Sequence, residues 1–191
     1  MSAVRTFTCI LLESEIRDAL GEWQKQLRSK YAGDFRWVTP VNLHITLTFL
    51  GDVPREQIAR ISETLRLSTA GSEPLDLEIS SAGAFPRADR PRVLWAGVGR
   101  GRESLVRIQD RVAGSLETEY GFEPERRQYH PHITVARARG RRGGPSITED
   151  LAGVSGRVWG NQRLRSVHLM KSALGPGGPV YTILDEIRLG E

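Results

Sequence analysis

A single cysteine, Cys9, is present among the 191 residues, and no hydrophobic run approaches the roughly 20 residues that a membrane-spanning helix needs. One thiol cannot close an intramolecular disulfide, so the hydrophobic core must hold the fold and a reducing, cytoplasmic setting is expected. The apolar stretch near the N-terminus ends at Glu13, too early for a secretory signal. These absences exclude a disulfide-stapled miniprotein and predict no membrane partner.

Lysine is also scarce, with 3 lysines beside 24 arginines. Residues 1–95 carry 12 basic and 12 acidic side chains and residues 96–191 carry 15 and 11, so the net charge of +4 lies in the second half. Six arginines and no acid lie between Arg126 and Arg142. This surplus favours a polyanionic partner, because arginine pairs with phosphate through two parallel hydrogen bonds. A solvated face in an arginine-biased sequence is the alternative, and charge alone leaves both open.

Hydrophobic periodicity predicts a chain of strands and helices. We expect strands at residues 6–12, 35–38, 43–50, 75–82, 92–98, 130–138, 164–174 and 180–189. We expect helices at 13–28, 55–67 and 104–120, and a long loop at 140–161 that contains a short helix near 148–152. The turn formers at 51–54 are expected to end the third strand. Because strand–helix–strand units do not alternate regularly, an α+β fold with mainly antiparallel sheets is favoured.

One short motif occurs twice. His44-Ile45-Thr46-Leu47 and His132-Ile133-Thr134-Val135 lie 88 residues apart, each on a predicted strand. Such a spacing is typical of two similar half-structures that each contribute one strand to a common site. No linker separates them, so we expect residues 1–191 to form a single bilobal domain with one His-x-Thr motif in each half.

Residues at i and i+2 of a strand point to the same face, so each motif presents an imidazole and a hydroxyl side by side while its aliphatic residues face the core. Histidine titrates near neutrality, so one imidazole can accept a proton while the other donates one. The threonine hydroxyls can donate hydrogen bonds to phosphate oxygens. The pattern therefore predicts acid–base cleavage of a phosphoester, with His44 and His132 catalytic and Thr46 and Thr134 binding the phosphate.

Other interpretations have less support in the sequence. A zinc site at His44, His130 and His132 lacks a further His, Cys or acid at a recognisable ligand spacing, and no Gly-x-Ser-x-Gly motif points to a serine hydrolase. A single strand histidine is commonly structural, but packing gives no reason to repeat the polar pair. His168 is expected to be structural, and His130 is expected to shape the approach to the site.

The two motifs and their surroundings resemble the two-histidine phosphoesterases, and more narrowly the LigT-like RNA 2′,3′-cyclic phosphodiesterases, also called 2′-5′ RNA ligases. The resemblance covers nearly the whole chain. It is carried by residues 37–51 (WVTPVNLHITLTFLG), residues 129–137 (YHPHITVAR) and the C-terminal strands around Ser172 and Gly178 to Tyr181. Departures are mild: Tyr129 stands where phenylalanine is commoner in the family, and Val135 where leucine is commoner.

The resemblance implies two pseudo-symmetric halves with outer helices that flank a central cleft, and hydrolysis of RNA 2′,3′-cyclic phosphate ends to 2′-phosphates without a metal or cofactor. It makes His44 the proton donor to the departing 3′ oxygen and His132 the base that activates water. It also implies that Arg137 binds the phosphate. Strict alternation conflicts with that role, because Arg137 is an odd number of positions from His132 and should face the core unless the strand bulges. The same count assigns Phe49 to the core.

The partners implied are RNA with 2′,3′-cyclic phosphate ends, tRNA fragments among them, or cyclic nucleotides, and a monomer is expected. The reverse reaction, formation of a 2′-5′ linkage, would use the same two histidines by microscopic reversibility. The alternative function is a nucleotide- or RNA-binding module without turnover on the same fold. Retention of both histidines and both threonines argues against it.

Overall fold

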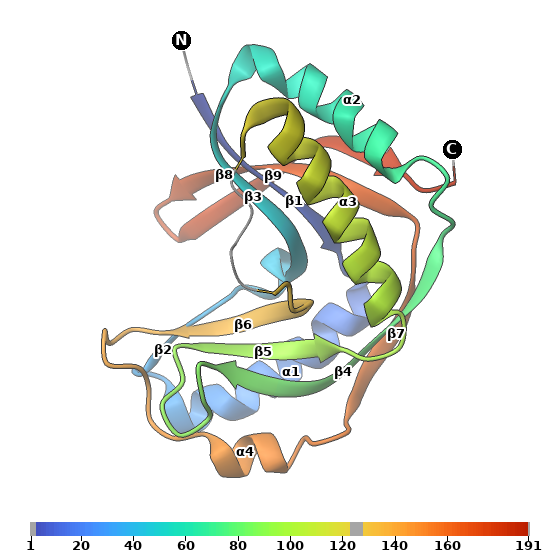
Figure 1. Cartoon of the computed structure of the whole chain (residues 1–191). Helices are drawn as coiled ribbons and strands as arrows, with labels where there is room; N and C mark the ends of the chain where they lie inside the picture. Colours follow the sequence, from blue (N-terminus) through green and yellow to red (C-terminus); the bar gives the residue numbers. More distant parts are fainter. Residues whose placement is uncertain (1–2, 123–127, 191) are drawn as a thin grey trace.

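The computed structural model describes residues 3–122 and 128–190 (Figure 1). Its α-helices are α1 (Ser14–Tyr31), α2 (Ile58–Thr69), α3 (Arg102–Tyr120) and α4 (Thr148–Ala152), with short 3-10 helices η1 (Pro40–Asn42) and η2 (Arg55–Gln57). The strands are β1 (Ala3–Leu11), β2 (Phe35–Trp37), β3 (His44–Pro54), β4 (Leu75–Phe85), β5 (Val93–Val98), β6 (His132–Ala138), β7 (Val158–Leu164), β8 (Ser166–Gly175) and β9 (Gly178–Arg188).

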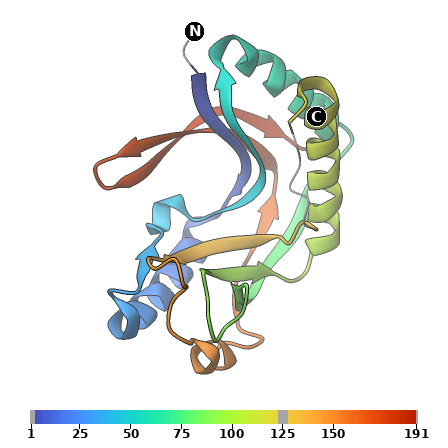
Figure 2. The ribbon, with the colours of Figure 1, turned by 60° about the vertical axis from the view of Figure 1, so that its left-hand side comes forward.

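All these strands belong to one curved antiparallel sheet with the order β7-β4-β5-β6-β3-β1-β8-β9, and β2 pairs with β6 (Figure 2). The predicted α+β class and antiparallel pairing are confirmed. The two halves are parts of one continuous sheet, joined where Ile45 of β3 pairs with Ile133 of β6. In the described residues this is one register pair, whereas neighbouring strands elsewhere share at least three.

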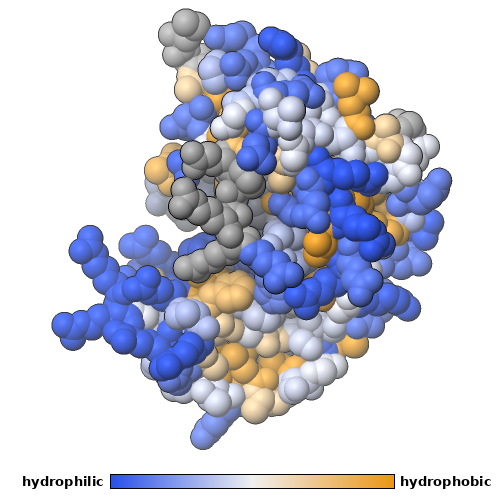
Figure 3. All heavy atoms as spheres, viewed as in Figure 1, coloured by the Kyte–Doolittle hydropathy of each residue, from blue (hydrophilic) through white to orange (hydrophobic). Residues whose placement is uncertain are grey.

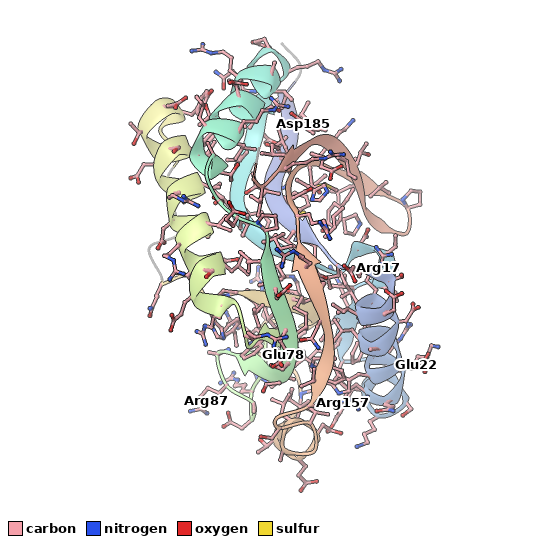
Figure 4. All side chains as sticks on the ribbon, turned by 90° about the vertical axis from the view of Figure 1, so that its right-hand side faces the viewer. Arg17, Glu22, Glu78, Arg87, Arg157 and Asp185 are labelled. Atoms are coloured by element: carbon pink, nitrogen blue, oxygen red, sulfur yellow. The ribbon has the colours of Figure 1, made fainter. Side chains whose placement is uncertain are left out.

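The spatial halves do not coincide with the halves of the sequence. Strands β8 and β9, from the C-terminal end, extend the half that contains β1 and β3, and α3 packs beside α2 on that half. Helix α1 instead packs against β7, where Trp23 meets Trp159 with ring centroids 4.8 Å apart (Figure 4, with Arg17 and Glu22 labelled on α1). Segments from each end of the sequence therefore pack in the half of the sheet built mainly by the other end.

A β-bulge follows the threonine of each repeated motif. In β3, Thr46 pairs with Cys9 and Thr48 with Thr8, so Leu47 is the extra residue. In β6, Thr134 pairs with Trp95 and Ala136 with Leu94, so Val135 is the extra residue. An extra residue changes which face the later side chains point to. Each bulge lies three residues after the histidine of its motif. The two motifs are therefore alike in backbone conformation as well as in sequence.

At both bulges, hydrogen bonds other than those between paired strand backbones satisfy backbone groups. Beside Leu47, the Thr48 amide donates to the Thr8 hydroxyl at 3.1 Å. At the second bulge, the Val135 carbonyl accepts hydrogen bonds from Gln24 Nε2 at 2.8 Å and from the Val38 amide at 3.0 Å. Gln24 is buried on α1, so a helix from one end of the chain stabilises the strand that carries the second motif. These hydrogen bonds offset part of the cost of interrupting the ladder, because buried polar groups without partners are destabilising.

Two expected boundaries were wrong. Strand β3 continues through Gly51 to Pro54 because a further bulge at Leu50 accommodates Gly51, whose φ is +71°. Strand β7 begins at Val158, inside the expected loop at 140–161. The short helix expected near 148–152 is confirmed as α4.

Close packing over Gly83 provides a test of the fold. A Cβ at Gly83 would lie 2.2 Å from Cζ2 of Trp95, on the neighbouring strand β5. We therefore expect Gly83→Ala to lower the free energy of unfolding by about 1–3 kcal/mol through overpacking. Gly114→Ala is the matched control. A Cβ at Gly114 in helix α3 would meet nothing within 4 Å beyond its chain neighbours and the nearby helix backbone, and the change should stabilise by about 0.5–1 kcal/mol. Urea unfolding of both variants measures this, and equal effects would contradict the packing.

Candidate active site

His44 and Thr46 lie on the face of β3 opposite the core. The core side of the same strand is occupied by Ile45 and Leu47, which are 0% and 4% exposed. His44 Nδ1 lies 2.7 Å from the carbonyl oxygen of Asn42 in η1, and Nε2 lies 3.0 Å from Thr46 Oγ1. The carbonyl can only accept, so Nδ1 carries a proton and Nε2 is the nitrogen that exchanges protons.

The second motif repeats this arrangement. His132 Nδ1 lies 2.7 Å from the carbonyl oxygen of His130, two residues earlier, as His44 Nδ1 does from Asn42. Ile133 and Val135 are fully buried behind it, while His132 and Thr134 are partly exposed. The predicted division of both motifs into a core side and a polar side is confirmed. Each strand thus holds its imidazole in the same tautomer, by a contact of Nδ1 with the carbonyl two residues earlier.

The Ile45–Ile133 pair determines how the two motifs face each other. When this antiparallel register is extended by one residue in each direction, Thr134 comes opposite His44, and Thr46 comes opposite His132. The histidines are then diagonal neighbours across the two strands, at a typical separation of about 7–8 Å. That spacing accommodates one phosphoryl group between two imidazoles, with a hydroxyl beside each ring.

The two bulges also bring Phe49 and Arg137 to this face. Each lies five residues after its histidine, and each follows one extra residue, so its side chain is turned from the core side to the motif side. Phe49 is 58% exposed, and its assignment to the core was wrong. Arg137 is exposed and interacts electrostatically with both His44 and Tyr181. The alternation that opposed Arg137 as a site residue fails because of the bulge at Val135.

Aromatic side chains that sequence reasoning missed surround both imidazoles. The His44 ring lies 5.1 Å from Phe7 and 5.4 Å from Tyr181, centroid to centroid. The His132 ring lies 5.2 Å from Phe85 and 6.4 Å from Trp95. These neighbours come from β1, β9, β4 and β5, so only the pairing of strands distant in sequence could reveal them.

Two hydrogen bonds connect the motifs to other parts of the chain. The Tyr129 hydroxyl, which precedes the second motif, donates to the Thr46 carbonyl of the first at 2.8 Å. Asn42 Nδ2 donates to the Pro179 carbonyl at the β8–β9 turn, also at 2.8 Å. Asn42 therefore anchors His44 with its carbonyl and the turn that precedes Tyr181 with its side chain.

Burial lowers the pKa of His44 below its ordinary value of 6.5, and the nearby positive charge of Arg137 and the proximity of His132 lower it further. The hydrogen bond to the Asn42 carbonyl partly opposes these effects. The free protein consequently favours the neutral form of His44 more than an ordinary histidine would. A bound phosphate anion opposes the burial effect and favours the charged ring.

The remaining histidines belong to neither repeated pair, although the His130 ring lies 6.4 Å from the His132 ring, centroid to centroid. His130 Nδ1 accepts a hydrogen bond from Arg102 Nη2 at 2.8 Å, and its ring contacts Trp95. His168 is partly buried on β8, where burial lowers its pKa and Glu186 opposes that effect. Over residues 3–122 and 128–190, no three His, Cys, Asp or Glu side chains gather as a metal site would require.

The arginine-rich segment continues from the end of β6. Arg139, Arg141 and Arg142 are exposed, and hydrophilic side chains gather around this end of the strand (Figure 3). Arg126 and Arg127, the other two of the six besides Arg137, lie outside the described residues. In the described part of the chain, no helix is both long and apolar enough to span a membrane.

Comparison with known proteins identifies the family of this chain. The family model for LigT like phosphoesterases matches residues 10–95. An RNA 2′,3′-cyclic phosphodiesterase of Aeropyrum pernix is 42% identical over 77% of this chain and 82% of its own length, and one from Methanothermobacter thermautotrophicus is 36% identical over 97% and 99%. The chain belongs to the LigT-like phosphoesterase family.

Solved structures of this family share the fold. A Thermus thermophilus protein superimposes with a TM-score of 0.81 at 28% identity over 97% of both chains. E. coli LigT complexed with 3′-AMP superimposes with a TM-score of 0.80 at 26% identity over the full length of both. The LigT-like fold of this chain, including the curved antiparallel sheet, is thereby established.

Replacing Arg137 tests the electrostatics of the site. Because the guanidinium disfavours the charged imidazole, Arg137→Gln should raise the pKa of His44, although burial should still hold it below 6.5. NMR titration of the histidine ring protons, assigned with His44→Ala, measures the shift. Arg141→Gln removes the same charge from the exposed loop and should leave the His44 titration unchanged. An unaltered His44 pKa in Arg137→Gln would show that Arg137 does not face the site.

Proposed function

We propose that this chain is an RNA 2′,3′-cyclic phosphodiesterase that hydrolyses terminal cyclic phosphates to 2′-phosphates by metal-independent acid–base catalysis. The observation that carries the proposal is the duplicated His-Thr pair, held on adjacent strands at the Ile45–Ile133 junction with each imidazole anchored through Nδ1. Relatives that match most of the chain are named RNA 2′,3′-cyclic phosphodiesterases, which supports the same activity here.

In the proposed reaction, His132 accepts a proton from a water molecule as the water oxygen bonds to phosphorus. The bond between phosphorus and O3′ breaks in line with the attack, and protonated His44 donates its Nε2 proton to O3′. Thr46 and Thr134 donate hydrogen bonds to the non-bridging oxygens, and Arg137 offsets their growing negative charge. The products are a 2′-phosphate and a free 3′-hydroxyl.

The anchoring of Nδ1 supports these roles. A ring fixed by a backbone carbonyl always presents Nε2 to the phosphate, so no tautomer change is needed between the acid and base forms. The assignment of His44 as the acid and His132 as the base follows the family resemblance. By microscopic reversibility, the same pair would join a cyclic phosphate to a 5′-hydroxyl in a 2′-5′ linkage.

We also propose that the substrates are RNA ends, tRNA fragments among them, or cyclic nucleotides, and that the chain acts as a cytoplasmic monomer. Both motifs lie in one continuous sheet, which supports a single bilobal functional unit over residues 1–191. The exposed arginines 139, 141 and 142 lie beyond the end of β6, where an RNA backbone extending from the site can meet them.

Hydrolysis of adenosine 2′,3′-cyclic phosphate, with identification of the product isomer, tests the function. We expect 2′-AMP, a bell-shaped pH profile, activity that resists chelators, and a loss of about 10²-fold or more in kcat for His44→Ala and for His132→Ala. His168→Ala is the matched control and should retain activity within about 3-fold, because His168 lies outside both pairs.

Full activity in either catalytic variant would remove that histidine from the mechanism, provided circular dichroism shows an unchanged fold. Dependence on added metal would favour a zinc enzyme. Negligible turnover together with tight, salt-sensitive RNA binding would favour the non-catalytic binding module.

A further inference from the structure

The aromatic groups beside the two imidazoles differ in construction. Next to His44, Phe7 lies 6.1 Å from Phe49 and 5.0 Å from Tyr181. Next to His132 stands a separate group, which we call the Trp95 platform and define as Trp95, Phe85 and His130. Its three members are partly exposed. No sequence motif assigns a function to Trp95 or Phe85.

Two glycines determine how the indole of Trp95 lies. Its six-membered ring covers Gly83 of β4, where a Cβ would be only 2.2–2.8 Å from three ring atoms, and it also borders Gly97, where a Cβ would be 3.3 Å from Cζ3. The space of two missing side chains is therefore filled by one flat ring that lies along the sheet. Trp95 pairs in register with Thr134, so the indole is on the same face as the second motif.

The other members complete the platform. The Phe85 ring lies 5.2 Å from the Trp95 ring with an angle of 34° between the planes, and the His130 ring stands edge-on at 5.0 Å and 86°. Arg102 donates to His130 Nδ1 at 2.8 Å, which orients the His130 ring and adds a positive charge at the margin. Aromatic rings beside cations are the common means by which proteins hold nucleobases without sequence preference.

The direction of the reaction indicates which nucleoside meets this platform. The attacking oxygen enters opposite the departing O3′, because displacement at phosphorus is in line. With His44 at O3′, the ribose and base of the cyclic phosphate lie on the His44 side, near Phe7, Phe49 and Tyr181. The His132 side receives the attacking group. Water is a small molecule and requires no aromatic surface.

We infer that the Trp95 platform is a second nucleobase site, which stacks the base of a nucleoside whose 5′-hydroxyl replaces water as the attacking group. The inference rests on the proposed function and adds to it a binding site for the nucleoside that supplies the 5′-hydroxyl. In the step, the 5′-oxygen bonds to phosphorus and passes its proton to His132, while the P–O3′ bond breaks and O3′ takes the proton of His44. No other reactant is needed, and the product is a 2′-5′ phosphodiester.

Partitioning between water and a nucleoside tests the site. Adenosine 2′,3′-cyclic phosphate is supplied with increasing adenosine, and 2′-AMP and 2′-5′ ApA are quantified together. We expect dinucleotide formation to saturate with adenosine, as binding requires. Trp95→Leu should lower the ratio of dinucleotide to 2′-AMP about 5- to 150-fold and make its dependence on adenosine linear, because one base stack is lost. Trp95→Phe should recover part of the ratio.

Phe49→Leu is the comparison on the opposite side. It should raise KM for the cyclic nucleotide and leave the product ratio unchanged, because both products come from the same bound cyclic phosphate. Melting temperatures of all variants identify any that fail to fold. The adenosine dependence of the unaltered protein remains a test in that event.

Each outcome distinguishes the inference from the proposed function. If the unaltered protein does not hydrolyse the cyclic phosphate, the proposed function fails. If it hydrolyses but forms no dinucleotide, or forms it without saturation, the second nucleobase site is wrong. The site is also wrong if Trp95→Leu leaves the ratio unchanged, and a raised KM with an unchanged ratio would assign the platform to the base of the cyclic nucleotide.

Discussion

The proposed active site depends on one contact between two strands, the pairing of Ile45 with Ile133. Both side chains are fully buried, so packing in the hydrophobic core fixes which face of each strand points inward. The register then fixes which polar residue of one motif lies opposite which residue of the other. A slip by one residue would turn every motif side chain to the other face. The Tyr129–Thr46 hydrogen bond lies beside this junction and connects the same two segments.

The polar faces of β3 and β6 were predictable because the alternation in both motifs is strong. Alternation also located the buried aliphatic residues behind them. Alternation failed for Phe49 and Arg137 because a bulge precedes each of them. Each bulge depends on contacts with residues distant in sequence, which a local pattern cannot show. Thr8 compensates the first bulge from another strand, and Gln24 compensates the second from helix α1.

Strand β7 was missed for a related reason. Its buried positions include Gln162, which donates to the Leu11 carbonyl and accepts from the Glu13 amide. A polar residue at a buried position breaks the alternation of apolar and polar residues that would have predicted a strand. Gly160 and Asn161 also read as turn formers, although they pair with β4. Long-range hydrogen bonds decide such elements, and the aromatic surroundings of both histidines likewise depend on strand order.

The repeat gives the two imidazoles the same backbone anchor but different aromatic neighbours. The proposed mechanism uses the two rings in opposite roles. His44 lies between Phe7 and Tyr181 with Arg137 nearby, so its proton is weakly held. His132 borders Phe85 and Trp95. In the proposed mechanism, His44 is the acid once a bound phosphate anion favours its charged form, and His132 is the base.

The central claim, that both imidazoles act on one phosphorus in one step, is tested most directly by a double-mutant cycle. The rate of cyclic phosphate hydrolysis is measured for His44→Ala, His132→Ala and the double variant. Groups that act as a unit lose their effect together, so the double variant should be about as slow as the slower single variant. Losses that multiply would show that the two histidines act independently and would contradict the account.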